Sequence, residues 1–184
     1  APLYNNFRLQ QLGGAYGTGK YVVVTVREVE TEEQFARVSK LPRVAGITGL
    51  NRMLLPARLE SDREVREAAA RLQADLLFLY TFETSFYEND LAKPLTILTL
   101  GLSPTRKVQV NTTVSALLLD TRTGYVYSTF EVSKGTDTLS TSWGTAESAD
   151  EARRKNEREA FDQLVNEFSA TWPRILQRHD STAK

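Results

Sequence analysis

The chain has 184 residues, of which 41% are hydrophobic and 25% charged, and its 23 basic side chains balance its 23 acidic ones. A length in this range is typical of one domain, and the balanced charge disfavours nucleic acid as the main partner. The absence of cysteine and the presence of a single histidine disfavour a transition-metal site, so the sequence predicts neither a metal nor a cofactor.

The first 19 residues are rich in glycine and have little apolar periodicity, so we expect an extended arm over 1–19. Residues 20–176 are predicted to form one α/β domain, and residues 177–184 a flexible tail. The first strand is predicted over 21–29, where nearly every residue is apolar, which favours a central place in its sheet. The longest apolar stretch, 95–102, is far shorter than the roughly 20 residues that a membrane-spanning helix needs.

Two short helices are predicted from capping signals. Thr31 and Gln34 form a capping box ahead of the first helix, and Ser61 and Glu64 form a second box ahead of the next. Between the two helices, residues 43–56 contain glycines that break both a helical and a strand period, while the apolar residues 53–55 are consistent with the end of a strand. We therefore predict a weak strand there.

A further strand and an antiparallel hairpin are predicted after the second helix. Residues 76–86 place aromatic side chains on one face of a strand, and residues 107–119 alternate between apolar and polar. Residues 120–124 supply turn chemistry, and residues 125–133 return as the partner strand. The polar residues 134–147 are predicted to form a surface loop.

A long amphipathic helix is predicted to end the chain. Ser148 and Glu151 form a third capping box ahead of it, and Pro173 is expected to end or kink it. The predicted fold class is therefore α/β (α+β), with a mixed sheet of about five strands that includes an antiparallel hairpin. Two short helices and one long C-terminal helix flank this sheet.

Two motifs contain the residue types of a nucleotide-binding site or a catalytic site, but neither stands in the sequence context that such a site requires. Residues 14–20 read GAYGTGK, the core of a phosphate-binding loop, but Tyr21 replaces the magnesium-binding Ser or Thr and a strand follows. His179, Asp180 and Ser181 are neighbours in a polar tail, so they cannot converge as a hydrolytic triad does. We therefore predict no catalytic residue.

Carboxylates leave a hydrolase open as an alternative. Four glutamates lie within 28–33, and Glu83, Glu88 and Asp90 follow further along the chain. Glycoside hydrolysis needs two carboxylates at a defined separation, which spacing in the sequence cannot show. We expect these groups to be solvated charges.

Aromatic residues near strand ends and in loops are the candidate binding residues, because aromatic side chains are enriched at binding surfaces. These candidates are Phe86, Tyr87, Tyr125, Tyr127 and Trp143.

Two segments resemble bacterial envelope lipoproteins. The sequence SDREVREAAARLQADLLFLY, residues 61–80, is similar to their alanine-rich helix followed by a strand that begins Ala74-Asp75-Leu76. The hairpin sequence LLLDTRTGYV around Asp120 is similar to their strand, Thr-Gly turn and return strand. With the long final helix, the chain resembles the superfamily of CsgG, LpoB and the amino-terminal domain of TolB. The turn also resembles that of rhombotarget-type lipoproteins.

The resemblance implies a non-catalytic, exported envelope accessory protein that binds an envelope protein or a cell-wall component. It implies a periplasmic or cell-surface location with a lipid tether, and membrane contact only through an anchor outside this chain. The chain begins with Ala1 rather than Met, which fits either removal of a signal segment or a designed start. Two alternatives stay open: a hydrolase with an unrecognised carboxylate site, and a self-assembling structural subunit.

Overall fold

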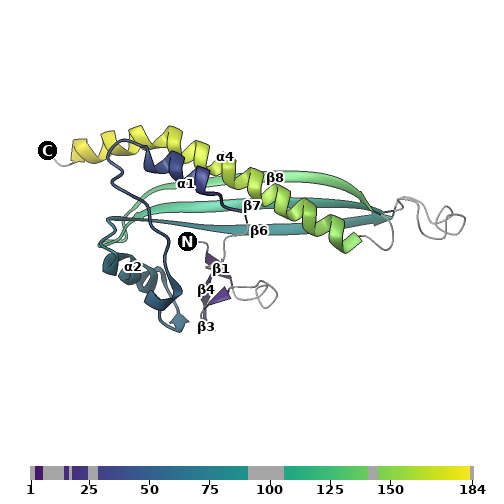
Figure 1. The fold of residues 1–184 in the computed structure, drawn as a ribbon, viewed down its shortest axis with the longest axis horizontal. Helices are drawn as coiled ribbons and strands as arrows, with labels where there is room; N and C mark the ends of the chain where they lie inside the picture. Colours follow the sequence, from purple (N-terminus) through teal and green to yellow (C-terminus); the bar gives the residue numbers. More distant parts are fainter. Residues whose placement is uncertain are drawn as a thin grey trace, which may run out of the picture. The chain divides into compact units, whose positions relative to one another are not determined.

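The computed structural model describes residues 3–5, 15–16, 18–24, 29–90, 106–140 and 145–182 (Figure 1). Among these residues, no helix has both the length and the apolar character that crossing a membrane requires. The elements in chain order are β1 (Leu3–Asn5), β2 (Ala15–Tyr16), β3 (Thr18–Gly19), β4 (Tyr21–Val24), α1 (Glu32–Ser39), the 3-10 helix η2 (Arg52–Leu54), β5 (Arg58–Leu59), α2 (Asp62–Arg71), β6 (Leu76–Asp90), β7 (Arg106–Asp120), β8 (Val126–Ser140) and α4 (Thr145–Thr182).

The α+β class is confirmed, but the strands form two sheets instead of one. In a five-stranded mixed sheet, β4 pairs antiparallel with β1, β2 and β5, while β3 and β5 are parallel. The predicted central place of the first strand is therefore confirmed. The described parts of the predicted arm, residues 1–19, are short strands of this sheet.

Strands β6, β7 and β8 form the second sheet in that order. The Thr121 N–H donates to the Asp75 carbonyl at 2.9 Å, whereas the Thr84 and Thr112 hydroxyls lie 2.9 Å apart. Residue numbers thus rise on β6 as they fall on β7, which makes this pair antiparallel. A tight turn joins β7 to β8, so the predicted hairpin is confirmed.

The chain divides into two compact units. Unit 1 comprises Ala1–Thr81, Ser115–Glu131 and Leu164–Lys184, and unit 2 comprises Phe82–Val114 and Val132–Gln163. The prediction of a single domain over 20–176 stays a prediction.

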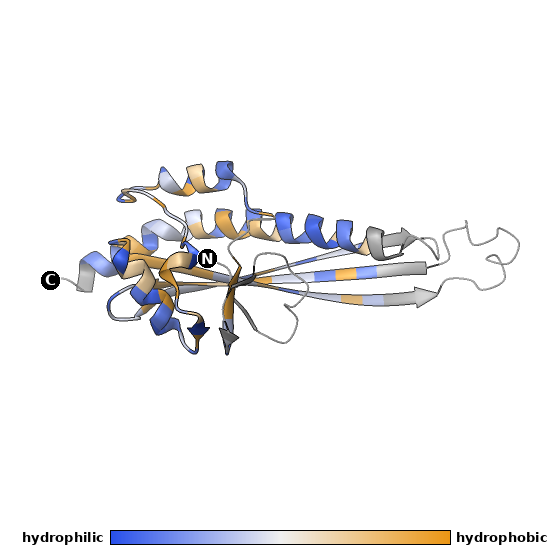
Figure 2. Cartoon of the chain, turned by 60° about the horizontal axis from the view of Figure 1, so that its bottom comes forward, coloured by the Kyte–Doolittle hydropathy of each residue, from blue (hydrophilic) through white to orange (hydrophobic). Residues whose placement is uncertain are grey.

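In unit 1, strand β6 is buried on both faces. Leu77 and Leu79 belong to a cluster that contains Val65 of α2, while Phe78, on the opposite face, lies 5.1 Å from the ring of Phe168 in α4. Successive side chains of a strand point to opposite faces, so this strand separates two apolar layers. Figure 2 shows the hydrophobic residues of α4 as bands between hydrophilic ones. Burial of each large side chain stabilises the unit by roughly 1.5–3 kcal/mol.

Unit 2 contains polar side chains packed between α4 and the sheet. Asn156 is fully buried; its Nδ2 donates to the Val110 carbonyl at 2.8 Å, and its Oδ1 accepts from the Thr136 hydroxyl at 2.6 Å. One turn earlier on the helix, Arg153 forms a 2.7 Å ion pair with the buried Glu157. Because a buried polar group without a partner lowers the stability of the fold, these bonds fix the position of α4 along the strands of unit 2.

The predicted strand over 43–56 is wrong. Those residues are irregular except for η2, where the Asn51 side chain accepts from the Met53 N–H at 2.9 Å. Arg43 has a positive φ of 63°, which interrupts an extended chain directly after Pro42. Local capping and this turn replace sheet pairing in the segment.

Near the C-terminus, the predicted end of β8 and the predicted start of α4 are wrong, and Pro173 does not end α4. Strand β8 continues to Ser140 into the predicted loop 134–147, because the polar Thr136 finds a buried partner on α4. Helix α4 begins at Thr145, before the predicted cap at Ser148. It also continues past Pro173 to Thr182. A proline inside a helix costs about 3 kcal/mol, and burial of Trp172 and Ile175 on either side of it offsets this cost.

Replacement of the buried amide tests the polar packing of unit 2. Asn156→Leu leaves the Val110 carbonyl and the Thr136 hydroxyl without their amide partner, so we expect the free energy of unfolding to fall by about 1–3 kcal/mol. Urea denaturation measures the change. The control Glu159→Leu, at an exposed position of the same helix, should change stability by less than about 0.5 kcal/mol. Equal losses for the two variants contradict the prediction.

Candidate interaction surface at the β7–β8 turn

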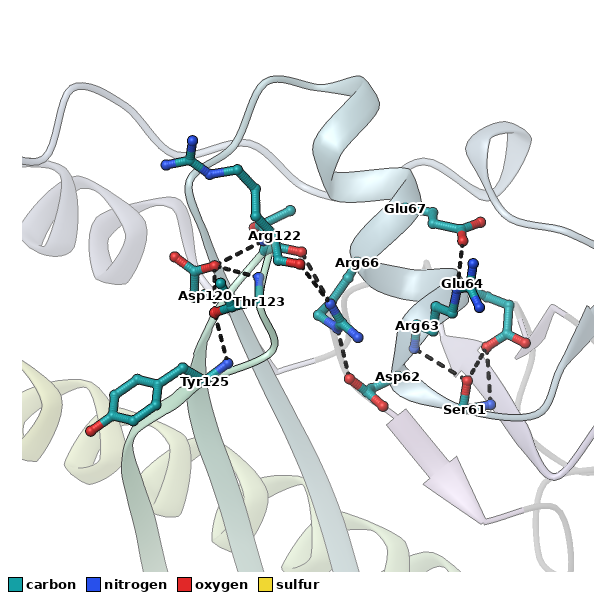
Figure 3. Close-up of polar contacts among 11 residues, drawn as sticks. Ser61, Asp62, Arg63, Glu64, Arg66, Glu67, Asp120, Arg122, Thr123 and Tyr125 are labelled. Atoms are coloured by element: carbon teal, nitrogen blue, oxygen red, sulfur yellow. Dashed lines mark hydrogen bonds and ion pairs between the residues drawn. The ribbon is translucent and has the colours of Figure 1, made fainter.

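A single carboxylate organises the turn between β7 and β8. The Oδ1 of Asp120 accepts hydrogen bonds from the Arg122 N–H at 3.0 Å, the Thr123 N–H at 2.6 Å and the Thr123 hydroxyl at 2.9 Å (Figure 3). The Gly124 N–H donates to the Asp120 carbonyl at 2.9 Å, and the Asp120 N–H to the Tyr125 carbonyl at 2.8 Å. Side-chain and backbone bonds together therefore define one turn geometry.

These bonds also change the acidity of Asp120. The hydrogen bond from the Thr123 N–H is the largest cause that lowers the pKa of this carboxyl below its ordinary value, and the Thr123 hydroxyl lowers it further. Donors to the ionised form favour that form. The turn is therefore most stable with Asp120 charged.

Helix α2 clamps the turn through Arg66. Its Nη1 donates to the carbonyls of Thr121 at 3.4 Å and Arg122 at 3.3 Å, while its Nε pairs with Asp62 at 2.8 Å (Figure 3). Gly124 has φ +75°, and a Cβ built there would lie 3.1 Å from the Arg66 guanidinium carbon. Glycine is thus favoured by the backbone conformation, and a larger residue would also displace the Arg66 guanidinium by a few tenths of an ångström.

The capping box of α2 places Arg66 for this contact. The Oε2 of Glu64 accepts from the Ser61 N–H at 3.0 Å and from the Ser61 hydroxyl at 2.7 Å, and these bonds help to lower the pKa of Glu64. The predicted start of the helix is therefore confirmed. Arg66 follows in the next turn, with the Asp62 carboxylate four residues before it.

The clamped turn presents exposed apolar side chains. Tyr125 is 64% exposed and Val126 45%, and Tyr127 is partly buried. The rings of Tyr125 and Tyr127 lie 5.1 Å apart in an edge-on arrangement, and His179 of α4 lies 6.0 Å from Tyr127. Burial is the main cause that raises the pKa of Tyr127. We call Tyr125, Val126 and Tyr127 the aromatic turn.

The predicted aromatic candidates do not form one group. Tyr125 and Tyr127 are in ring contact in unit 1, whereas Phe86 and Tyr87 are exposed neighbours on β6 in unit 2 and point to opposite faces. Trp143 lies outside the described residues.

The sequence predicted the turn but not three residues that belong to it or contact it: Val126, Arg66 and His179. Val126 was predicted only as a residue of the strand 125–133. Arg66 and His179 reach the turn from positions more than 50 residues away in the chain, and no local pattern signals such a contact.

The phosphate-loop motif has no helix after it. Its described residues form β2 and β3 and lead into β4, as predicted, and Lys20 Nζ lies 5.3 Å from the Tyr21 ring centroid. A strand at this point provides no helix N-terminus for a phosphate.

Two of the other titratable candidates, Asp180 and Glu30, make ordinary structural contacts. Asp180 pairs with Arg43 at 2.8 Å, and Glu30 accepts from the Tyr80 hydroxyl at 2.7 Å. Glu83 is exposed, and the side chains of Glu88 and Asp90 lie outside the described residues. Within the described part of the chain, no three His, Asp or Glu side chains are grouped to hold a metal ion.

The lowered pKa of Asp120 predicts a pH-dependent contribution to stability. A depressed pKa stabilises the fold above the ordinary aspartate value of about 3.9, and the contribution is lost as pH falls through the folded-state pKa. We expect the stability difference between wild type and Asp120→Asn to narrow on acidification from about pH 7 to about pH 3. Urea denaturation at each pH measures it, with the exposed Glu159→Gln as the control for loss of one carboxylate. A difference that stays constant with pH contradicts the prediction.

Removal of the clamp should loosen the turn. Arg66→Met loses the bonds to two backbone carbonyls and to Asp62, so we expect about 1–2 kcal/mol of destabilisation and faster amide exchange at Gly124. The control Arg63→Met breaks the exposed pair with Glu67 and should cost less than about 0.5 kcal/mol. Chemical denaturation and amide exchange by NMR compare the two. If both variants exchange alike, Arg66 is not the clamp.

Comparison with known proteins includes a weak structural likeness. No family model and no curated protein match the chain. The chain is similar to the crystal structure of a protein from Caulobacter crescentus CB15 described as a candidate lipoprotein, with 18% identity over 76% of this chain and 95% of that chain. The TM-score is 0.31. A likeness of this size carries no argument about function, and membership of the CsgG, LpoB and TolB superfamily stays a prediction.

Proposed function

We propose that this chain is a non-catalytic accessory protein of the bacterial cell envelope that binds another envelope component through the aromatic turn. One observation carries the proposal: Tyr125 and Val126 stay exposed on a turn whose backbone is fixed by Asp120 and Arg66. Side chains presented on a fixed backbone lose little conformational entropy when they bind, so more of their contact energy contributes to affinity.

The composition of the aromatic turn supports a partner with both apolar and polar groups. Tyrosine combines a large apolar ring with a hydroxyl, and it is enriched at interfaces for that reason. Tyr125 packs edge-on against Tyr127, which limits its rotation. A protein surface or a cell-wall glycan offers a suitable combination of apolar and hydrogen-bonding groups.

The proposed location rests on the sequence resemblance. The alanine-rich helix followed by Ala74-Asp75-Leu76, and the turn beginning at Asp120, are the segments similar to envelope lipoproteins. These segments form α2, the start of β6 and the aromatic turn, which lie together in unit 1. The resemblance therefore falls on the part of the protein that presents the proposed binding surface.

Truncation of the exposed side chains tests the binding surface. Tyr125→Ala combined with Val126→Ser should reduce capture of envelope components by about tenfold or more, because interface anchors of this kind contribute at least 2 kcal/mol together. Quantitative mass spectrometry compares the immobilised wild type and variant after incubation with detergent-solubilised envelopes of the source cells. Lys155→Ala, at an exposed position of α4, serves as the control. An unchanged set of captured components sinks the proposed surface.

Fractionation tests the proposed location separately. The full-length protein of the source cells should sediment with envelope membranes and be released by detergent but not by high salt, because a lipid tether is not screened by ions. Recovery in the cytoplasmic fraction contradicts export. That result leaves the binding test unaffected, so the two parts of the proposal can fail independently.

A further inference from the structure

The net charge of zero conceals an uneven distribution of charge along the chain. The segment 34–59 contains five basic residues and no acidic one, although the two kinds are equal in number overall. It connects α1 to α2 and belongs to unit 1 (Figure 1). The basic residues are Arg37, Lys40, Arg43, Arg52 and Arg58.

The same segment exposes large apolar side chains. Met53 is 83% exposed, the highest value among large hydrophobic residues in the described part of the chain, and Ile47 is 42% exposed. The Asn51 side chain caps η2 through the Met53 N–H, while Leu50 and Leu54 pack against the core of unit 1. The turn is therefore anchored from inside and holds Met53 toward solvent.

A hydrogen bond from α4 holds the segment at Pro42. The Trp172 Nε1 donates to the Pro42 carbonyl at 2.8 Å, and the next residue, Arg43, has φ 63°. A non-glycine residue keeps such a φ only where its surroundings hold it. The basic and apolar side chains are therefore carried by a backbone tied to the fold at both ends.

We propose that the exposed side chains of this segment bind an anionic phospholipid membrane. We call these residues the basic–apolar strip: Lys40, Arg43, Ile47, Arg52, Met53 and Arg58. Cations attract a negatively charged bilayer, and separate apolar side chains enter the boundary between headgroups and acyl chains. The charge complementarity favours a lipid surface, and the exposed methionine favours it over a purely polar polyanion.

Two of the cations have partners that a lipid phosphate can replace. Arg43 pairs with Asp180 and Arg58 with Glu60, and all four side chains are largely exposed. Exposed ion pairs contribute little to stability, so they exchange readily for phosphate contacts. Lys40 and Arg52 are exposed as well. This activity is separate from the aromatic turn and does not depend on the proposed function.

Vesicle co-sedimentation tests the proposal with the 184-residue chain. We expect binding to vesicles of phosphatidylcholine and phosphatidylglycerol in equal amounts, weak binding to phosphatidylcholine alone, and weaker binding at high salt. Lys40→Glu with Arg52→Glu should reduce the affinity at least about tenfold. Lys155→Glu with Arg158→Glu, an equal charge change at exposed positions of α4, should reduce it less than about threefold.

A fluorescent label tests insertion of the apolar side chain. The chain has no cysteine, so Met53→Cys carries an environment-sensitive dye at one site. Its emission should shift to shorter wavelength on phosphatidylglycerol vesicles, whereas the same dye on Lys155→Cys should not respond. Met53→Ser should lower vesicle affinity by about fivefold, and the Tyr125→Ala and Val126→Ser double variant should bind vesicles as wild type does.

Three results overturn the proposal. One is absence of wild-type binding to phosphatidylglycerol vesicles, and another is an equal loss for the two charge-reversal pairs, which indicates a net-charge effect. The third is a combined result: the chain binds soluble polyglutamate as tightly as vesicles, and the dye at position 53 does not respond. That result identifies an acidic polymer as the ligand. Circular dichroism of each variant verifies that it is folded.

Discussion

Burial of β6 on both faces is the constraint on which unit 1 depends. Leu77 and Leu79 require one apolar layer and Phe78 requires another, so the strand is stable only when α2 covers one side and α4 the other. An edge or single-faced strand would leave one of these sets in water. The position of both helices in unit 1 therefore follows from one short stretch of β6.

Each docked helix in turn fixes an irregular segment through one side chain. Arg66 of α2 binds two carbonyls of the β7–β8 turn, and Trp172 of α4 binds the carbonyl of Pro42 at the start of the basic–apolar strip. Loops usually lack such ties and are correspondingly mobile. Here, buried apolar residues hold each helix in place, and one side chain of that helix then holds the backbone of a surface segment in one conformation. The two surfaces differ in chemistry, since one is aromatic and the other basic with separate aliphatic side chains.

Total charge and local charge give different expectations for this protein. The equal numbers of acidic and basic residues removed any reason to expect attraction to an anionic surface. That argument holds at long range, but contact is governed by charges within about a Debye length. Over 34–59 acidic residues are absent from the sequence. Lys40, Arg43, Ile47, Arg52, Met53 and Arg58 are exposed there, although Leu55 and Leu59 of the same segment are buried in the core. This local excess of exposed basic residues supports an anionic partner, which the total charge alone disfavours.

The sequence by itself determined the elements whose signals lie within a few residues. The capping boxes at Thr31 and Ser61 and the turn at Asp120 were all predictable, because each depends on hydrogen bonds between residues at most five apart. Strict alternation likewise predicted β7, since every second side chain from Val110 to Leu118 is buried. These local features include the part of the aromatic turn that the sequence identified.

Tertiary structure decided everything that depends on a distant partner. Strand β8 extends through Thr136 because a helix supplies Asn156, and α4 continues past Pro173 because Trp172 is buried on unit 1. The clamp from Arg66 and the division of the strands into two sheets have the same origin. Such contacts form only once the chain has collapsed, and their stabilisation exceeds the local preference of a proline, a polar strand residue or a glycine-rich segment.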